Sequence, residues 1–122
     1  MAEAEKLVFM VTRGPDEAEL ATIPFVMAAA ALASDVDVVT GFQGDGVELV
    51  KSGIAETVEA PGFPPLKKLL DDVRGLGGSL LVCGPCLKSR GITADDLVAG
   101  AEIVAAGRFI AEITTATNSL VY

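Results

Sequence analysis

Short apolar runs recur along the chain, and each is bounded by glycine, proline or charged residues. Four to eight apolar and β-branched residues between such boundaries are typical of buried strands. The last run alternates apolar and polar residues, which also predicts a strand. The predicted strands are Lys6–Thr12, Val36–Thr40, Ile54–Glu59, Leu80–Cys83 and Phe109–Thr115.

Helical patterns separate these runs. The clearest is Leu66–Leu76, where leucines and a valine recur at helical spacing and two glycines follow. Alanine, methionine and leucine favour a helix from about Thr22 to Ser34, with Pro24 in its first turn, where proline is tolerated. A short helix is predicted over Val47–Lys51, and a longer one, with an N-cap at its start, from Thr93 to Ala106.

Strands that alternate with helices predict a single α/β domain over residues 1–122, built on a mostly parallel, five-stranded sheet covered on both faces. The chain is 51% hydrophobic with a mean hydropathy of +0.51, yet no apolar run approaches the roughly 20 residues of a membrane span. Burial between subunits explains this excess, so we expect a homo-oligomer and no membrane association. The tail Asn118–Tyr122 is expected to pack on a neighbouring subunit.

Charge and composition exclude several classes of function. Nine basic and seventeen acidic residues give a net charge of −8, which disfavours nucleic acid as a partner. Histidine is absent, so a Ser-His-Asp triad, a Cys-His dyad and histidine-ligated metals are excluded. We predict no cofactor and no metal. The acidic N-terminus lacks the pattern of a secretory signal, which favours a cytoplasmic protein with reduced thiols.

The chemistry is expected at Cys83 and Cys86, the two cysteines of the chain, which follow a predicted strand in the segment CGPC. The carboxyl ends of strands in open α/β sheets are where ligands bind. A free thiol has a pKa of about 8.5 and reacts as the thiolate. We expect the backbone N–H groups around Gly84, with Lys88 and Arg90, to stabilise that thiolate.

Other interpretations of this segment stay open. Either cysteine also fits the role of a small buried core residue, and Lys88 and Arg90 fit that of solvated loop residues. A thioredoxin-type oxidoreductase also has a Cys-x-x-Cys pair, but the pair lies late in this chain and tryptophan is absent. A metal site shared between subunits is a further alternative. Asp45 also follows a predicted strand and is a candidate for the same cleft, although a turn residue is the commoner role.

Several of these segments together resemble the DsrE/DsrF-like family, which includes YchN-like proteins and the TusD sulfur-relay subunits. The residues that carry the resemblance are Cys83-Gly84-Pro85-Cys86, Ser89-Arg90-Gly91-Ile92, Phe42-Gln43-Gly44-Asp45-Gly46-Val47 and the ending Phe109–Thr115. The resemblance implies a three-layer α/β/α sandwich that assembles as a trimer or hexamer in the cytoplasm. It also implies a persulfide on Cys83, received from a donor protein and passed to an acceptor protein.

Two hypotheses about function follow. In the first, Cys83 carries sulfane sulfur in a sulfurtransferase-like relay, and Cys86 is a possible resolving thiol. In the second, the chain is a non-catalytic oligomeric or regulatory module that binds a small ligand or a partner in the same cleft. The sequence leaves open which of the two cysteines is the more reactive.

Overall fold

Five parallel strands form the centre of the protein, which is described here from a computed structural model covering residues 4–122. Their order across the sheet is β4-β3-β2-β1-β5, so each strand pairs with the strand before it in the chain except β5, which returns to the far edge next to β1. The strands are β1 (Lys6–Val11), β2 (Asp37–Phe42), β3 (Ser79–Cys83), β4 (Ala101–Val104) and β5 (Asn118–Val121).

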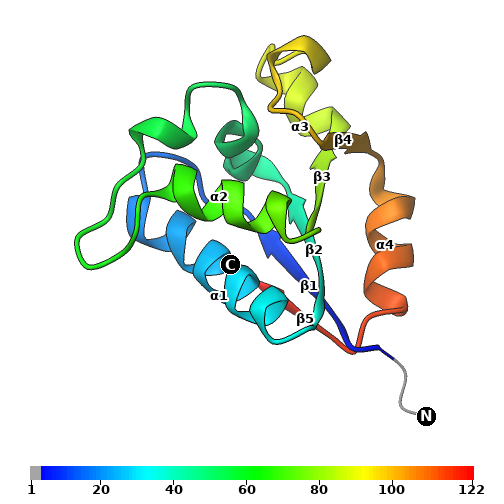
Figure 1. The fold of residues 1–122 in the computed structure, drawn as a ribbon. Coiled ribbons are helices and arrows are strands. Elements are labelled where there is room, and N and C mark those ends of the chain that lie inside the picture. The colour runs from blue at the N-terminus through cyan, green and yellow to red at the C-terminus, as the bar shows by residue number, and fades with distance from the viewer. Residues whose placement is uncertain (1–3) are drawn as a thin grey trace.

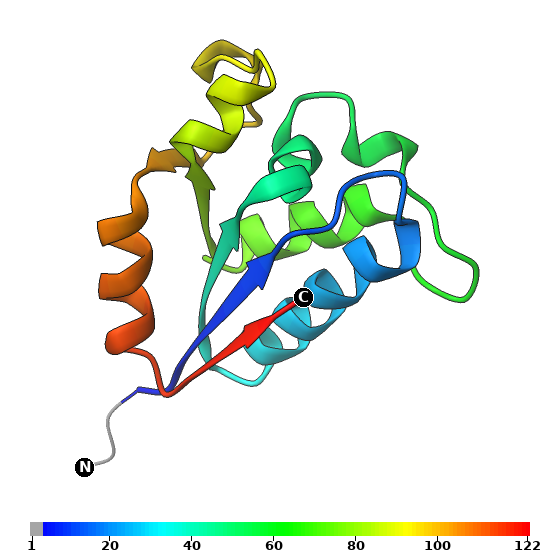
Figure 2. The ribbon, with the colours of Figure 1, turned by 180° about the vertical axis from the view of Figure 1, so that it is seen from behind.

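Helices cover the two faces of this sheet unequally. Figure 1 shows α1 and α2 side by side on one face and α4 on the other, with α3 beyond the ends of the strands, and Figure 2 shows the same layers from behind. The result is a three-layer α/β/α arrangement. The helices are α1 (Ala18–Ala33), α2 (Leu66–Gly75), α3 (Gly84–Ser89) and α4 (Ala106–Thr114), with short 3₁₀ turns at η1 (Gly44–Val50), η2 (Ala55–Thr57) and η3 (Ala94–Asp96).

The core is correspondingly divided into a large and a small cluster. The large one lies between the sheet and helices α1 and α2, and includes Phe9, Phe25, Phe42 and Leu70. The small one lies under α4 and consists of Val8, Met10, Val39, Leu81 and Phe109. Because successive strand residues point to opposite faces, each central strand contributes to both clusters, which explains its continuous apolar run.

Most of the predicted elements in the first two thirds of the chain are confirmed. The strands predicted at Lys6, Val36 and Leu80 are β1, β2 and β3, and the helix predicted from Leu66 is α2. Helix α1 begins four residues earlier than predicted, so Pro24 lies inside it and not in its first turn. Because proline has no N–H, the Leu20 carbonyl lacks its usual partner within the helix.

Several other predictions are wrong. Ile54–Glu59 is not a strand but contains the turn η2, and the helix predicted from Thr93 to Ala106 is η3 followed by β4. The segment predicted as the strand Phe109–Thr115 forms the end of helix α4 and its C-cap, and the predicted tail Asn118–Tyr122 holds strand β5 of the same chain. The sheet still has five strands, all of them parallel. Within residues 4–122, no helix has the length and apolar character needed to cross a membrane.

Candidate functional site

The two cysteines lie where β3 meets α3, at the carboxyl end of the sheet. Cys83 is the last residue of β3 and also the N-cap of α3, and Pro85 lies in the first turn of that helix. Cys86 is one turn further along the chain, so its side chain returns toward Cys83. Both thiols are free and half-buried. The predicted position at a strand end is confirmed.

The sulfur atoms themselves are close. Cys86 Sγ lies 2.7 Å from Cys83 Sγ, so the two thiols share a hydrogen bond. A disulfide bond is about 2.05 Å long. The reduced pair is therefore already arranged so that one sulfur can react at the other with little movement of the backbone.

A second loop contributes to the site from the end of the neighbouring strand. Strands β2 and β3 pair with Phe42 opposite Val82, so the turn η1 after β2 begins beside α3. The Gly44 N–H donates to Cys86 Sγ over 3.3 Å. Gly44 has a φ of +55°, a conformation that glycine adopts without strain. Sequence reasoning missed this donor, because backbone groups leave no signal in side-chain patterns.

Asp45 and Arg90 are brought together at the same place. Arg90 Nη2 lies 2.8 Å from Asp45 Oδ1, and Arg90 Nη1 donates to the Cys86 carbonyl oxygen over 3.1 Å. Asp45 raises the already high pKa of the Arg90 guanidinium. Arg90 thus links η1 to the helix that carries Cys86. Asp45 therefore lies near the cysteine pair, but its carboxylate binds Arg90 and not a sulfur atom.

The electrostatics at Cys83 differ from the sequence-based expectation. Burial is the largest cause acting on the pKa of the Cys83 thiol and raises it, and the hydrogen bond with the Cys86 thiol raises it further. The Cys86 backbone N–H and the charge of Arg90 lower this pKa, but they do not offset the two larger effects. In the reduced pair, Cys83 is therefore protonated at neutral pH.

Lys88 and Gly84 lie on the other side of α3. They line a hollow of about 320 Å³ whose walls also include Leu87, Ile92 and Ile103. Among the charged side chains, Arg90 lowers the Cys83 pKa, and the role of Lys88 in stabilising a thiolate stays a prediction. Gly84 allows close packing here, since a Cβ at this position would lie 3.3 Å from Ile103 Cγ2.

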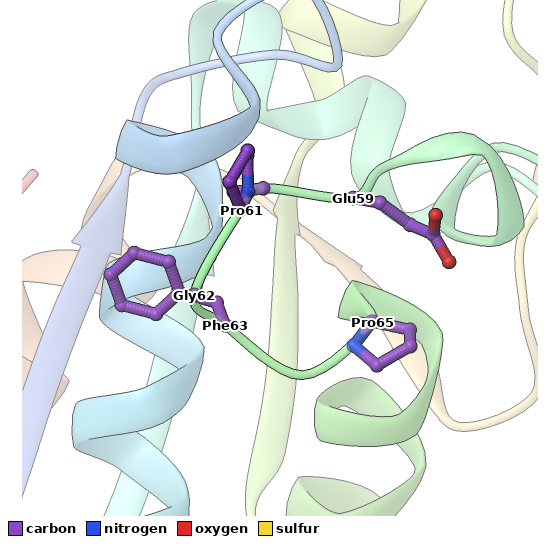
Figure 3. A pocket seen from close by; sticks show the side chains of 6 residues that line it. Glu59, Pro61, Gly62, Phe63 and Pro65 are labelled. Atoms are coloured by element: carbon purple, nitrogen blue, oxygen red, sulfur yellow. The ribbon is translucent and has the colours of Figure 1, made fainter.

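Other features of the structure do not compete with this site. A hollow of about 420 Å³ in the loop after η2, shown in Figure 3, is lined by two prolines, a phenylalanine and Glu59 as its one ionisable side chain. Among residues 4–122, no three side chains of the types that ligate metals gather closely enough to hold an ion. At the cysteine pair, by contrast, two thiols lie together with an arginine and a carboxylate.

Comparison with known proteins places this fold and this pair in context. Residues 5–122 match the DsrE/DsrF-like family, which covers the whole α/β unit together with both cysteines. The chain belongs to the DsrE/DsrF-like family. The family implies a role in sulfur relay, and the Cys-x-x-Cys pair of this member lies at the sheet edge described above.

Solved structures support the fold of this DsrE/DsrF-like chain. The YchN protein of E. coli superimposes with a TM-score of 0.81 at 21% sequence identity, over 97% of this chain and 99% of that protein. A protein of unknown function from Methanobacterium thermoautotrophicum, MTH1491, gives a TM-score of 0.74 at 16% identity, over 97% and 99% of the two chains. The sheet flanked by helices is thus a YchN-like fold.

Sequence relatives occur in Methanocaldococcus jannaschii. The uncharacterized protein MJ0989 is 28% identical over 96% of this chain and 99% of its own length. The uncharacterized protein MJ0760 is 31% identical over 90% of this chain, but the chain spans only 40% of that relative.

Proposed function

We propose that this DsrE/DsrF-like protein carries sulfane sulfur as a persulfide on Cys83 and passes it to a thiol of an acceptor protein. The observation that carries the proposal is the pair of sulfur atoms 2.7 Å apart at the carboxyl end of β3. Membership of the DsrE/DsrF-like family, which implies a role in sulfur relay, supports it. A half-buried thiol at a strand end is accessible to a donor and partly protected from water.

Loading is a transfer between sulfur atoms without net oxidation. The Cys83 thiolate attacks the outer sulfur of a donor persulfide, and the donor's S–S bond breaks with its electron pair leaving on the donor thiolate. The proton of the Cys83 thiol goes to solvent or to that leaving thiolate. Because the pKa of Cys83 is raised, only a minority of the thiol is ionised at neutral pH, and loading should accelerate as the pH rises.

The test is mass spectrometry of the intact protein after incubation with cysteine persulfide. A mass increase of one sulfur atom is expected on Cys86→Ser and not on Cys83→Ser. The Cys86→Ser variant is the sensitive one, because it keeps Cys83 and lacks a thiol that could remove the added sulfur. A Cys86→Ser protein that gains no sulfur would contradict the proposal.

A binding module is the second candidate, and two observations favour it. The raised pKa makes Cys83 a weaker nucleophile at neutral pH, and the hollow on the other side of α3 has apolar walls from Leu87, Ile92 and Ile103. In that case the site would hold an apolar side chain of a partner or a small ligand, and no variant would acquire sulfur.

We further propose that the protein is a cytoplasmic homo-oligomer, a trimer or hexamer, that receives sulfur from one protein and delivers it to another. Large apolar side chains at the surface support self-association, among them Ile110 with 59% and Val121 with 74% of its surface exposed. Sedimentation equilibrium of the reduced protein measures the subunit number, and a monomer at micromolar concentration would contradict this part.

A further inference from the structure

We propose that the carried sulfur has a second outlet: when no acceptor thiol arrives, Cys86 attacks the Cys83 persulfide and releases hydrosulfide, with Asp45 as the residue that positions Cys86 through Arg90. This inference rests on the proposed persulfide on Cys83, and it adds a sulfide-releasing activity to a carrier. The protein would then act as a persulfide reductase as well as a relay.

The chemistry balances within the pair. The Cys86 thiolate attacks Sγ of Cys83, a new Cys83–Cys86 S–S bond forms, and the bond between Cys83 and the carried sulfur breaks. The electron pair leaves with the carried sulfur as HS⁻, and the Cys86 proton passes to solvent. The carried sulfur is reduced by two electrons while the two cysteine sulfurs are oxidised to the disulfide. A dithiol reductant must then restore both thiols, so the reaction that follows in the cell is a thiol–disulfide exchange.

The geometry favours Cys86 as the attacking sulfur in this step. Its Sγ is 2.7 Å from Cys83 Sγ and accepts the Gly44 N–H over 3.3 Å. Cys86 is therefore close to the sulfur it must attack, and the Gly44 N–H holds its side chain on that side of the helix.

Asp45 and Arg90 hold these groups together across the chain. Arg90 binds the carboxylate of Asp45 and the carbonyl oxygen of Cys86 at the same time, with distances of 2.8 Å and 3.1 Å. Asp45 directly follows Gly44, so the ion pair fixes the loop whose N–H reaches Cys86 Sγ. Neither Asp45 nor Arg90 touches Cys83 Sγ through a hydrogen bond, and their role is therefore positioning and not catalysis.

The first experiment follows sulfide in time. Protein is loaded with cysteine persulfide without oxygen, desalted, and assayed for released sulfide and for intact mass. The wild-type protein is expected to release one sulfide per chain and to lose two hydrogens relative to the reduced protein. Cys86→Ser is expected to keep its extra sulfur atom. A wild-type protein that gains sulfur and retains it as long as Cys86→Ser overturns this inference alone. If Cys86→Ser gains no sulfur, the proposed function itself is overturned, and this inference with it.

The second experiment tests the positioning role. Once loaded with sulfur, Asp45→Asn should release sulfide about fivefold more slowly than the loaded wild type, a modest change because the ion pair is partly exposed. Asp45→Glu, which keeps the charge, should recover most of the rate. Asp72→Asn is the matched control, since it removes a similar surface ion pair with Lys68 far from the cysteines. Sulfide release by Asp45→Asn at the wild-type rate overturns the role of Asp45.

Discussion

Phe109 holds α4 against the sheet. Truncating its side chain tests the packing between α4 and the face of the sheet that Cys83 borders. The Phe109 side chain is 4% exposed and packs on Val8, Met10, Val39 and Leu81, which together form the small cluster of the core. Cys83 packs at the edge of that cluster. Replacing Phe109 with alanine removes the largest side chain under α4 and opens this edge to water.

The expected loss of stability follows from the size of the cluster. Truncating a buried phenylalanine to alanine costs about 3 to 5 kcal/mol. Because this cluster is small and bounded by a single short helix, its neighbours can close part of the cavity, and we expect a loss of about 3 kcal/mol. A chain of this length has a free energy of unfolding of roughly 6 to 18 kcal/mol, so the variant should still fold.

Urea denaturation followed by circular dichroism measures this change. The urea concentration at the midpoint of unfolding should fall, while the slope of the free energy of unfolding against urea concentration stays the same. That combination shows that the substitution lowers stability. Thr114→Ala is the matched control: Thr114 lies on the same helix, is exposed, and should change the free energy of unfolding by less than about 1 kcal/mol. Equal effects of the two substitutions would refute the packing of α4 described here.

The same variant makes a prediction about the thiol. Burial is the largest cause of the raised pKa of Cys83, so water admitted by Phe109→Ala should lower that pKa. Alkylation of Cys83 at neutral pH, measured in a Cys86→Ser background, should therefore be faster with the Phe109→Ala substitution than without it. An unchanged rate would mean that burial by the α4 cluster does not control this thiol.

Three further results are expected. Cys86→Ala should lower the pKa of Cys83, because the partner thiol raises it, so iodoacetamide should alkylate Cys83 faster at pH 7 than it does in the wild type; slower alkylation would contradict this. Gly41→Ala should cost about 1 to 3 kcal/mol in urea unfolding, because its Cβ would overlap side chains of β1 and α4, whereas Gly107→Ala meets no atom within 4 Å and should not destabilise. Two cations hold the pKa of Glu112 below its ordinary value of 4.5, so its contribution to stability is present above that pH and is lost as the pH falls through the folded pKa. Glu112→Gln should flatten the stability profile in this acidic window, and an unchanged profile would refute the pairing.

Much of the central architecture was predictable because buried parallel strands have a distinctive pattern. Both faces of β3 are covered, so Leu80–Val82 is apolar without interruption and the strand end at Cys83 can be located. Helix α2 has one buried and one charged face, which yields a clear helical period. The position of the cysteine pair at the sheet edge follows from these local patterns.

The last third of the chain was assigned wrongly because its local signals are ambiguous. In the segment from Phe109 to Thr115, β-branched residues and alternation favour a strand, yet Phe109 and Ile113 are also four residues apart. Both pack on the small cluster, and this tertiary contact selects the helix. Strands β4 and β5 are four residues long and lie at the edges of the sheet, half exposed, so neither shows a buried run.

The sequence by itself determined the α/β class, the parallel sheet, and a thiol pair at the end of a strand, because each depends on residues close together in the chain. Only the tertiary structure decided the surroundings of that pair. The contact between Asp45 and Arg90 joins residues 45 positions apart, and the Gly44 N–H reaches Cys86 because β2 and β3 end side by side. Burial where β3 meets α3 raises the pKa of Cys83, which no local pattern of charges could predict.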